Sequence, residues 1–178
     1  YIDLWVDGEL SYRIKPSPAV AKIKALQQEG AVFSGDPAEP LYGDTYLPRK
    51  FKVAVTVPAD NSVDLLTQDI GLVLFCDPQG RPMGCNVYVG GGMGRTHNKE
   101  ETFARTADAL GYVEAEHVLD LVQAIVALQR DHGDREQRRH ARMKYLIHDR
   151  GVAWFKQELK TNYFPHPIKG LRLEPTTK

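Results

Sequence analysis

The sequence predicts an α+β domain in which helices pack on one side of a mainly antiparallel, mixed sheet. Three strand-like runs come first, at residues 51–57, 70–77 and 83–89. Segments with the apolar spacing of helices follow them. Strands grouped before helices, in a chain of 178 residues, are typical of one α+β core rather than of alternating α/β units.

The three predicted strands differ in pattern. Valines alternate with Lys52, Ala54 and Thr56 in the first run, which is typical of a half-buried strand. The second, "IGLVLFCD", is almost continuously apolar and indicates a buried strand. The third, "MGCNVYV", follows the turn "PQGR", so the last two runs are expected to form a hairpin.

A hairpin centred on Gly80 and Arg81 places Cys76 directly opposite Cys85. Direct cross-strand disulfides are geometrically strained, so we expect two small, buried, reduced thiols. Two cysteines are also too few for a four-cysteine zinc site or an iron–sulfur cubane.

Four helices are expected after the strands. The second is the best defined, because one face carries apolar residues at helical spacing, and the third is very basic. The first contains Phe103, Ala107 and Leu110 and ends at a glycine. The four predicted helices are residues 99–111, 114–133, 135–148 and 151–163.

The chain divides into three expected parts. Residues 1–45 read as a lead-in from a preceding domain, with a short strand, an Asp7–Gly8 turn, a helix over 19–29 and a loop over 34–44. Residues 46–163 form the central domain and residues 164–178 a tail. Because the chain starts at Tyr1 rather than at methionine, we expect it to be a fragment of a longer protein.

Composition excludes several classes of function. Lysine plus arginine equals aspartate plus glutamate at 23 each, so the chain is not a general polyanion binder and any basic site must be local. No apolar run approaches the roughly 20 residues that cross a bilayer. The histidines are scattered, and no pair of His97, His117 and His140 has metal-ligand spacing.

A local basic site is found in "YLPRKFKVAVTVP". Lys50 and Lys52 are two residues apart, which in a strand places both amines on one face and Arg49 on the other. One interpretation is a solvated strand edge that lysines protect from aggregation. The other, about equally weighted on physical grounds, is an anion pocket in which lysine also delivers protons.

The stretch "VGGGMGRTHNK" is the second candidate. Gly90, Gly91 and Gly92 follow a strand and allow the backbone to approach a flat or anionic group, and Arg95 and His97 add donors. Its spacing matches neither the dinucleotide fingerprint nor the phosphate loop of nucleotide hydrolases. A flexible hairpin loop is the alternative interpretation, and a cofactor-facing loop is favoured.

Three long stretches carry a resemblance to a known family. "YLPRKFKVAVTVPADNSVDLLTQDIG", "NVYVGGGMGRTHNKEETFARTADALGYV" and "VALQRDHGDREQRRHARMKYLIHDRGVAWFK" occur in this order. Together they resemble the central part of assimilatory sulfite reductases of the ferredoxin-dependent type, within the sirohaem/[4Fe–4S] nitrite and sulfite reductase superfamily. The resemblance extends from about residue 42 to the end.

The resemblance implies an oxidoreductase that reduces sulfite to sulfide with six electrons at a sirohaem joined to a [4Fe–4S] cluster. Lys50 and Lys52 match lysines that bind and protonate sulfite, and Arg49 matches an arginine beside the sirohaem carboxylates. The triple-glycine loop is expected near the macrocycle. The family's cluster ligands, a Cys-x5-Cys and a Cys-x3-Cys pair, are missing, and Cys76 and Cys85 match neither spacing.

The same resemblance distinguishes substrates and partners. Related nitrite reductases carry asparagine where Lys52 stands, so sulfite is favoured over nitrite. We expect ferredoxin as electron donor, the remaining domains of the same polypeptide as partners, and a cytoplasmic or plastid-stromal location without a membrane. We also expect the chain alone to be folded, colourless and inactive.

The alternative from another class is a non-catalytic anion- or nucleic-acid-binding module. It rests on the run "RDHGDREQRRHARMK", which has six lysines and arginines. A solvated helix, or one packed on acidic neighbours, is the favoured interpretation of that run.

Overall fold

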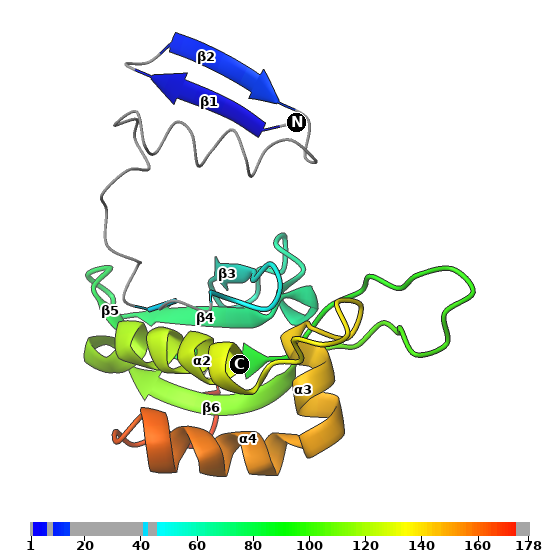
Figure 1. Cartoon of the computed structure of the whole chain (residues 1–178). Helices are drawn as coiled ribbons and strands as arrows, with labels where there is room; N and C mark the ends of the chain where they lie inside the picture. The colour runs from blue at the N-terminus through cyan, green and yellow to red at the C-terminus, as the bar shows by residue number, and fades with distance from the viewer. Residues whose placement is uncertain (1, 7–8, 15–40, 43–45, 174–178) are drawn as a thin grey trace. The chain divides into compact units, whose positions relative to one another are not determined.

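The computed structural model describes residues 2–6, 9–14, 41–42 and 46–173, and the chain divides into two units, Tyr1–Pro40 and Leu41–Lys178. In the first unit, β1 (Ile2–Val6) pairs antiparallel with β2 (Glu9–Ile14), which confirms strand structure there (Figure 1). The predicted helix over 19–29 and the Asp7–Gly8 turn lie outside the described residues.

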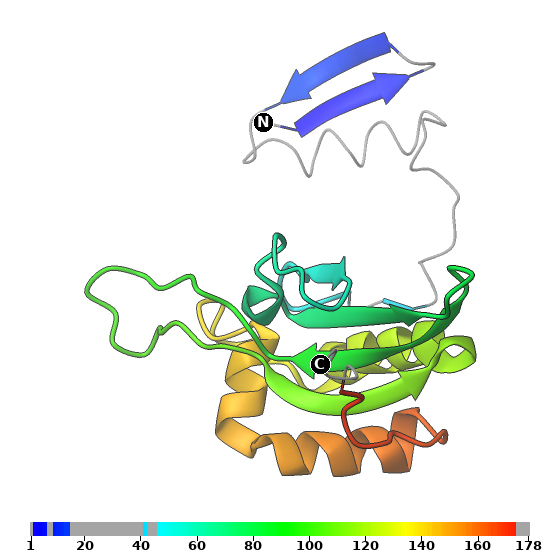
Figure 2. The same ribbon diagram turned by 180° about the vertical axis from the view of Figure 1, so that it is seen from behind.

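The second unit is built on a four-stranded sheet with the order β3-β4-β5-β6. β3 (Val53–Thr56) runs parallel to β4 (Ile70–Cys76), whereas β4 with β5 (Pro82–Val89) and β5 with β6 (Asp108–Glu114) are antiparallel (Figure 2). The predicted mainly antiparallel, mixed sheet is therefore confirmed.

The helices of this unit cover one face of the sheet. α2 (Val118–His132) lies along that face, and α3 (Met143–Arg150) and α4 (Val152–Glu158) follow it (Figures 1 and 2). Short 3-10 turns at Leu65–Thr67 and Ala115–His117 and a π turn at Leu159–Tyr163 complete the elements. No helix in the described part of the chain is long and apolar enough to cross a bilayer.

The core lies between α2 and the sheet. Leu121, Ile125 and Leu128, at helical spacing on α2, are fully buried. They belong to one apolar cluster with Ile70 of β4 and Val87 of β5, which are also fully buried. The apolar periodicity that predicted this helix is thus the face that packs on the sheet.

The prediction of a helix over residues 99–111 is wrong. The structure has irregular backbone there, followed by β6, in which Leu110 and Val113 are buried. Gly111, interpreted as a helix stop, is a strand residue with φ 146° whose added Cβ would lie 2.4 Å from the carbonyl oxygen of Lys169. Pairing with β5 overrides the local helical spacing of Phe103 and its neighbours.

The third predicted helix, over 135–148, is shorter than expected, because α3 begins only at Met143. The side chain of Asp134 accepts hydrogen bonds from the backbone N–H groups of Glu136 and Gln137, each at 2.9 Å. This gives the chain a turn that competes with a helix. The fourth helix is confirmed, with α4 and the π turn covering the predicted residues.

The expected pairing of the cysteines is also wrong. Cys85 lies opposite Leu74, and Cys76 lies opposite Pro82 after a bulge between Phe75 and Cys76. The turn lies over Asp77–Gly80, where the N–H of Gly80 donates to the carbonyl oxygen of Asp77, and is not centred on Gly80 and Arg81 as expected. Cys85 therefore pairs two residues away from Cys76, and the bulge adds one further residue of offset beyond Phe75. Both thiols are free; Cys85 is buried as expected, but Cys76 is exposed.

This register gives the two thiols different reactivities. We expect Cys76 to react rapidly with a thiol reagent at pH 8 and Cys85 to react slowly, because burial raises the pKa of Cys85 to about 11. Stopped-flow labelling should show one fast thiol, which disappears in Cys76→Ser. Two equally fast thiols in the folded chain would contradict the assignment.

Candidate functional site

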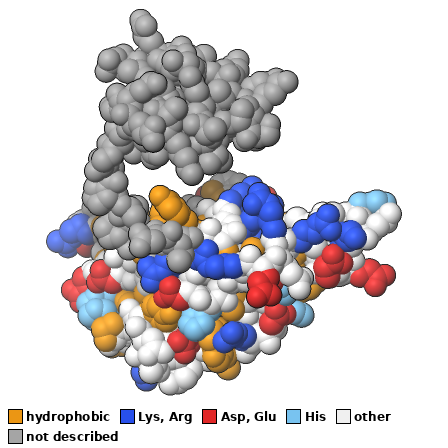
Figure 3. All heavy atoms as spheres, viewed as in Figure 1, with side chains coloured by type: hydrophobic (Ala, Val, Ile, Leu, Met, Phe, Trp, Pro, Cys, Tyr) orange, Lys and Arg blue, Asp and Glu red, His pale blue; other side chains and the backbone are white. Residues whose placement is uncertain are grey.

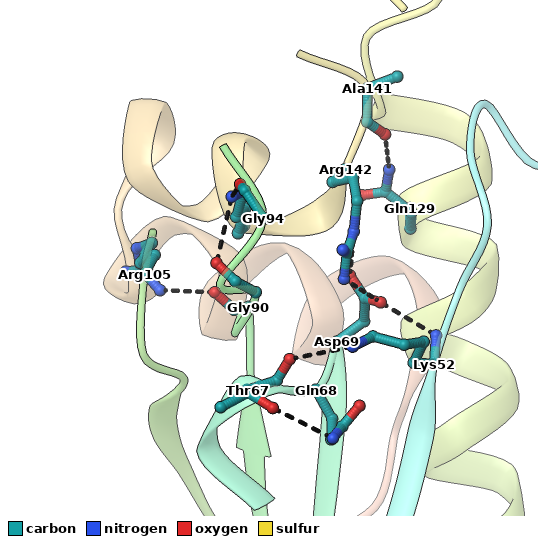
Figure 4. Close-up of polar contacts among 12 residues, drawn as sticks. Lys52, Thr67, Gln68, Asp69, Gly90, Gly94, Arg105, Gln129, Ala141 and Arg142 are labelled. Carbon is teal, nitrogen blue, oxygen red and sulfur yellow. Dashed lines mark hydrogen bonds and ion pairs between the residues drawn. The ribbon is translucent and has the colours of Figure 1, made fainter. Parts of the chain in front are cut away.

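A buried ion pair organises the region around the predicted basic site. Asp69, which immediately precedes β4, is fully buried, and its Oδ2 lies 2.7 Å from Nη2 of Arg142, the residue before α3. The same Oδ2 accepts the backbone N–H of Lys52 at 3.0 Å (Figure 4). Burial raises the pKa of Asp69, while Arg142 and Lys52 favour its charged form.

Lys50 and Lys52 do not follow the alternation of a strand, because β3 begins only at Val53. The Nζ of Lys52 donates to the carbonyl oxygen of Thr67 at 3.4 Å (Figure 4). Lys50 instead lines a pocket together with Arg49, although these two were expected on opposite faces. Lys52 is not among the residues that line this pocket.

The pocket has a volume of about 270 Å³ and a strongly positive lining. Its lining combines the segment before β3, the long loop between β5 and β6, and the residues around the start of α3. Six of its lining residues are lysine or arginine and none is acidic; the full lining is Arg49, Lys50, Gly94, Arg95, Thr96, Thr102, Arg139, Arg142, Lys144 and Tyr145. Figure 3 shows basic side chains gathered at the base of that long loop.

One donor of the pocket has no partner. Nη1 of Arg49 is buried and makes no hydrogen bond within the described residues. Buried polar atoms are almost always paired, so an orphaned guanidinium N–H in a positive pocket fits an anionic ligand such as a carboxylate or an oxyanion.

The glycine loop is fixed at its start. The N–H groups of Gly90 and Gly91 donate to the carbonyl oxygens of Asp69 and Gln68, both at 2.9 Å. A Cβ on Gly91 would lie 2.2 Å from the carbonyl oxygen of Leu66, so glycine is required there by close packing on the chain itself. The predicted glycines are therefore buried, and it is Gly94 that lines the pocket.

A buried lysine holds the loop from the other side. Lys144 of α3 is 1% exposed, and its Nζ donates to the carbonyl oxygens of Gly92 at 3.1 Å and of Gly94 at 2.7 Å, and also to that of Phe103. Burial lowers the pKa of Lys144, and Arg142 lowers it further. Lys144 was not predicted as a site residue, although a lone lysine inside the apolar run "MKYLI" was a usable signal.

The structure thus brings together part of the predicted site. Arg49, Lys50 and Arg95 line the pocket. His97 lies further along the loop, where it is exposed and outside the pocket lining. Asp69 and Arg142 were not predicted, because their contact joins positions far apart in the sequence.

Comparison with known proteins identifies the family. The family model described as "Nitrite and sulphite reductase 4Fe-4S domain" matches residues 13–168. This chain belongs to that family. The pocket and its glycine loop both lie within the matched residues.

Relatives of the chain include two proteins that are named as sulfite reductases. The chain is 61% identical over 161 residues to "Sulfite reductase [ferredoxin]" of Synechococcus elongatus, covering 90% of this chain and 25% of the relative. It is 42% identical over 167 residues to "Sulfite reductase [NADPH] subunit beta" of Saccharomyces cerevisiae, covering 90% of this chain and 12% of the relative. The chain therefore spans a quarter or less of these relatives.

A solved structure agrees with the fold. The NirA protein of Mycobacterium tuberculosis superposes with a TM-score of 0.61 at 28% identity, covering 90% of this chain and 26% of that protein. The α+β architecture described above is therefore shared with a longer protein, of which this chain matches 26%.

Removing the Asp69 carboxylate should strongly lower the stability of the folded chain. Asp69→Ala leaves the Arg142 guanidinium, which is 14% exposed, without its partner, so we expect a loss of about 3–5 kcal/mol in the free energy of unfolding. Glu114→Ala, which removes an exposed ion pair with Lys169, should cost less than about 1 kcal/mol. Urea unfolding of both variants makes the comparison, and equal losses would contradict the assigned role of Asp69.

Removing the buried amine should loosen the loop. Lys144→Met leaves three carbonyl groups without their donor, so we expect about 1–3 kcal/mol of destabilisation and faster hydrogen exchange at the N–H groups of Gly92 and Arg105, which bond to each other's carbonyls. Lys156→Met, on the exposed side of α4, is the control. Unchanged exchange at Gly92 and Arg105 would show that Lys144 does not hold the loop.

Proposed function

We propose that this chain is part of a sulfite reductase and provides the anion-binding side of its active centre. The proposed reaction is the six-electron reduction of sulfite to sulfide. The single observation that carries the proposal is the pocket lined by six cations and no carboxylate, with an unpartnered Arg49 N–H. The 61% identity with a ferredoxin sulfite reductase supports sulfite as the substrate.

The pocket fits the anionic groups of the proposed cofactors and substrate. Sirohaem carries many carboxylates, and Arg49 and Arg95 would hold them through charge-assisted hydrogen bonds. Gly94 has nothing within 4 Å of an added Cβ, so a flat group can approach its backbone. When bound, the sirohaem and [4Fe–4S] centre would transfer to sulfite the electrons that the donor provides. Gly90, Gly91 and Gly92 are buried and His97 lies outside the pocket lining, so in this proposal they shape the loop rather than contact the cofactor.

The cluster ligands lie elsewhere in the proposed enzyme. A [4Fe–4S] cluster takes four thiolates, and this chain has two cysteines. Cys85 is buried with its pKa raised to about 11, which disfavours the thiolate that a cluster requires. The proposed enzyme therefore has further domains, with residues 1–45 leading into the central domain of 46–163 and 164–178 leading out.

Lys50 and Lys52 are proposed to hold sulfite and to deliver protons. Each S–O bond that breaks releases an oxygen that must be protonated, so several protons have to reach the anion. Lys50 is exposed at the pocket. The Nζ of Lys52 makes one long hydrogen bond, 3.4 Å to Thr67, and exchanging it for a bond to an oxyanion costs little.

Ferredoxin is the proposed electron donor. The support is the higher identity to the relative named for ferredoxin, 61%, than to the yeast relative named for NADPH, 42%. We place the enzyme in a reducing compartment, the cytoplasm or a plastid stroma, in keeping with two free cysteines among the described residues.

The test of substrate choice is Lys52→Asn in the complete reductase. Losing one proton-donating cation should lower kcat/KM for sulfite by about 10²-fold or more, while kcat/KM for nitrite, a smaller monoanion, falls less. Steady-state kinetics with both substrates gives the ratio, and Lys156→Asn on the exposed surface is the control. A sulfite-to-nitrite ratio that does not change would refute the role of Lys52.

The 178-residue chain alone should be folded but colourless, and it should not oxidise reduced methyl viologen in the presence of sulfite. Circular dichroism, visible absorbance and the viologen assay test this together. Sulfite turnover by the chain alone would contradict the proposal that the rest of the centre lies in other domains.

A further inference from the structure

Three side chains of metal-ligating types meet at the start of α2, outside the lining of the pocket that contains Arg49. His117, in the turn before α2, and Asp120, in the first turn of α2, lie beside His166. One ligand atom from each residue lies within 4.8 Å of those of the other two. Spacing along the chain did not indicate this cluster, because His166 follows the last helix and is far from His117 in the sequence.

The two imidazole rings lie directly against each other. The rings of His117 and His166 stack with their centroids 3.8 Å apart and an angle of 15° between their planes. The rings of Phe164 and His166 meet edge to face, with 5.2 Å between their centroids. Both histidines are half-buried, while Asp120 is exposed. Within the described part of the chain, Asp120 and His166 have no hydrogen-bond partner, so binding a cation would not break a hydrogen bond of either side chain.

Two imidazole nitrogens and one carboxylate oxygen form a donor set suited to a late divalent cation. Zinc takes nitrogen and oxygen ligands at about 2.0–2.2 Å in a tetrahedron, which places ligand atoms about 3.3–3.5 Å apart. The three ligand atoms now lie within 4.8 Å of one another. Because a cation lies in the plane of each imidazole that binds it, binding requires one of the two stacked rings to turn out of the stack, and water completes the four positions. The carboxylate of Glu116, 3.4 Å from Nε2 of His117, adds negative charge nearby.

We propose that His117, Asp120 and His166 bind one divalent cation of the zinc class. The site is separate from the pocket that contains Arg49, and it does not depend on the proposed reductase function. The cation clamps the segment after the π turn onto the start of α2.

Such a clamp adds to contacts that already hold this segment. The N–H groups and carbonyl oxygens of Tyr112 and Lys169 bond reciprocally, and Arg172 N donates to the side chain of Asn86 at 2.8 Å. Because its ligands are brought together only in the folded chain, the cation binds the folded state preferentially and should raise Tm.

The test uses the 178-residue chain without a histidine tag. Calorimetric titration with Zn²⁺ should show one saturable site, Co²⁺ should give the visible absorbance of a tetrahedral nitrogen and oxygen site, and Zn²⁺ should raise Tm. His166→Ala and His117→Ala should each weaken Zn²⁺ binding by at least about 10-fold, since changes even in outer-shell groups cost this much.

The matched control is His148→Ala, which removes an exposed histidine of α3 and should bind Zn²⁺ as the parent chain does. Asp120→Asn removes an exposed ligand with the least effect on packing, so it keeps the test valid where a histidine variant does not fold. Circular dichroism in EDTA establishes folding. The absence of a saturable site in the parent chain, or equal binding by Asp120→Asn and the parent chain, would overturn the proposal.

Discussion

The second unit depends on how one buried carboxylate is satisfied. Asp69 accepts a side-chain hydrogen bond from Arg142 and a backbone hydrogen bond from Lys52, and its carbonyl oxygen accepts the N–H of Gly90. It therefore joins the residues before β3, β4, the glycine loop and α3 at one point. Burying a charge of this kind is tolerated only when its partners are well placed, so the four segments must be packed around Asp69 at the same time.

The chain concentrates positive charge around that point and neutralises only part of it. Asp69 pairs with Arg142, and the Lys144 amine donates hydrogen bonds to three carbonyl groups. The remaining cations of the pocket have no carboxylate in its lining, and among the described residues Arg49 keeps a buried N–H without a partner. A potential of this kind favours a multiply charged anion.

Sequence patterns predicted those parts of the fold in which local periodicity and tertiary packing agree. The apolar run of β4 and the apolar face of α2 are the two sides of one core, so both were predictable. The segment that begins near Phe103 has helical spacing, but it is irregular up to β6 and pairs with β5 only from Asp108 onward, and nothing local reveals the partner strand. Basic residues before β3 indicated Arg49 and Lys50, whereas Asp69 and Lys144 act through contacts to distant segments.

The same contacts explain the basic run of residues 130–144 without a nucleic acid. Arg130 donates to the carbonyl oxygen of Leu41, and Arg135 to that of Tyr46. Arg142 pairs with Asp69, and Lys144 donates to carbonyl groups of the glycine loop.

Only Arg138 and Arg139 of that run stay exposed in the described structure without such a role in the fold, and Arg139 lines the pocket. A phosphate backbone is bound by several solvent-facing cations, whereas most cations of this run contact the chain itself or line the pocket. Its charges fasten the segment between α2 and α3 to the rest of the unit and make one wall of the pocket positive.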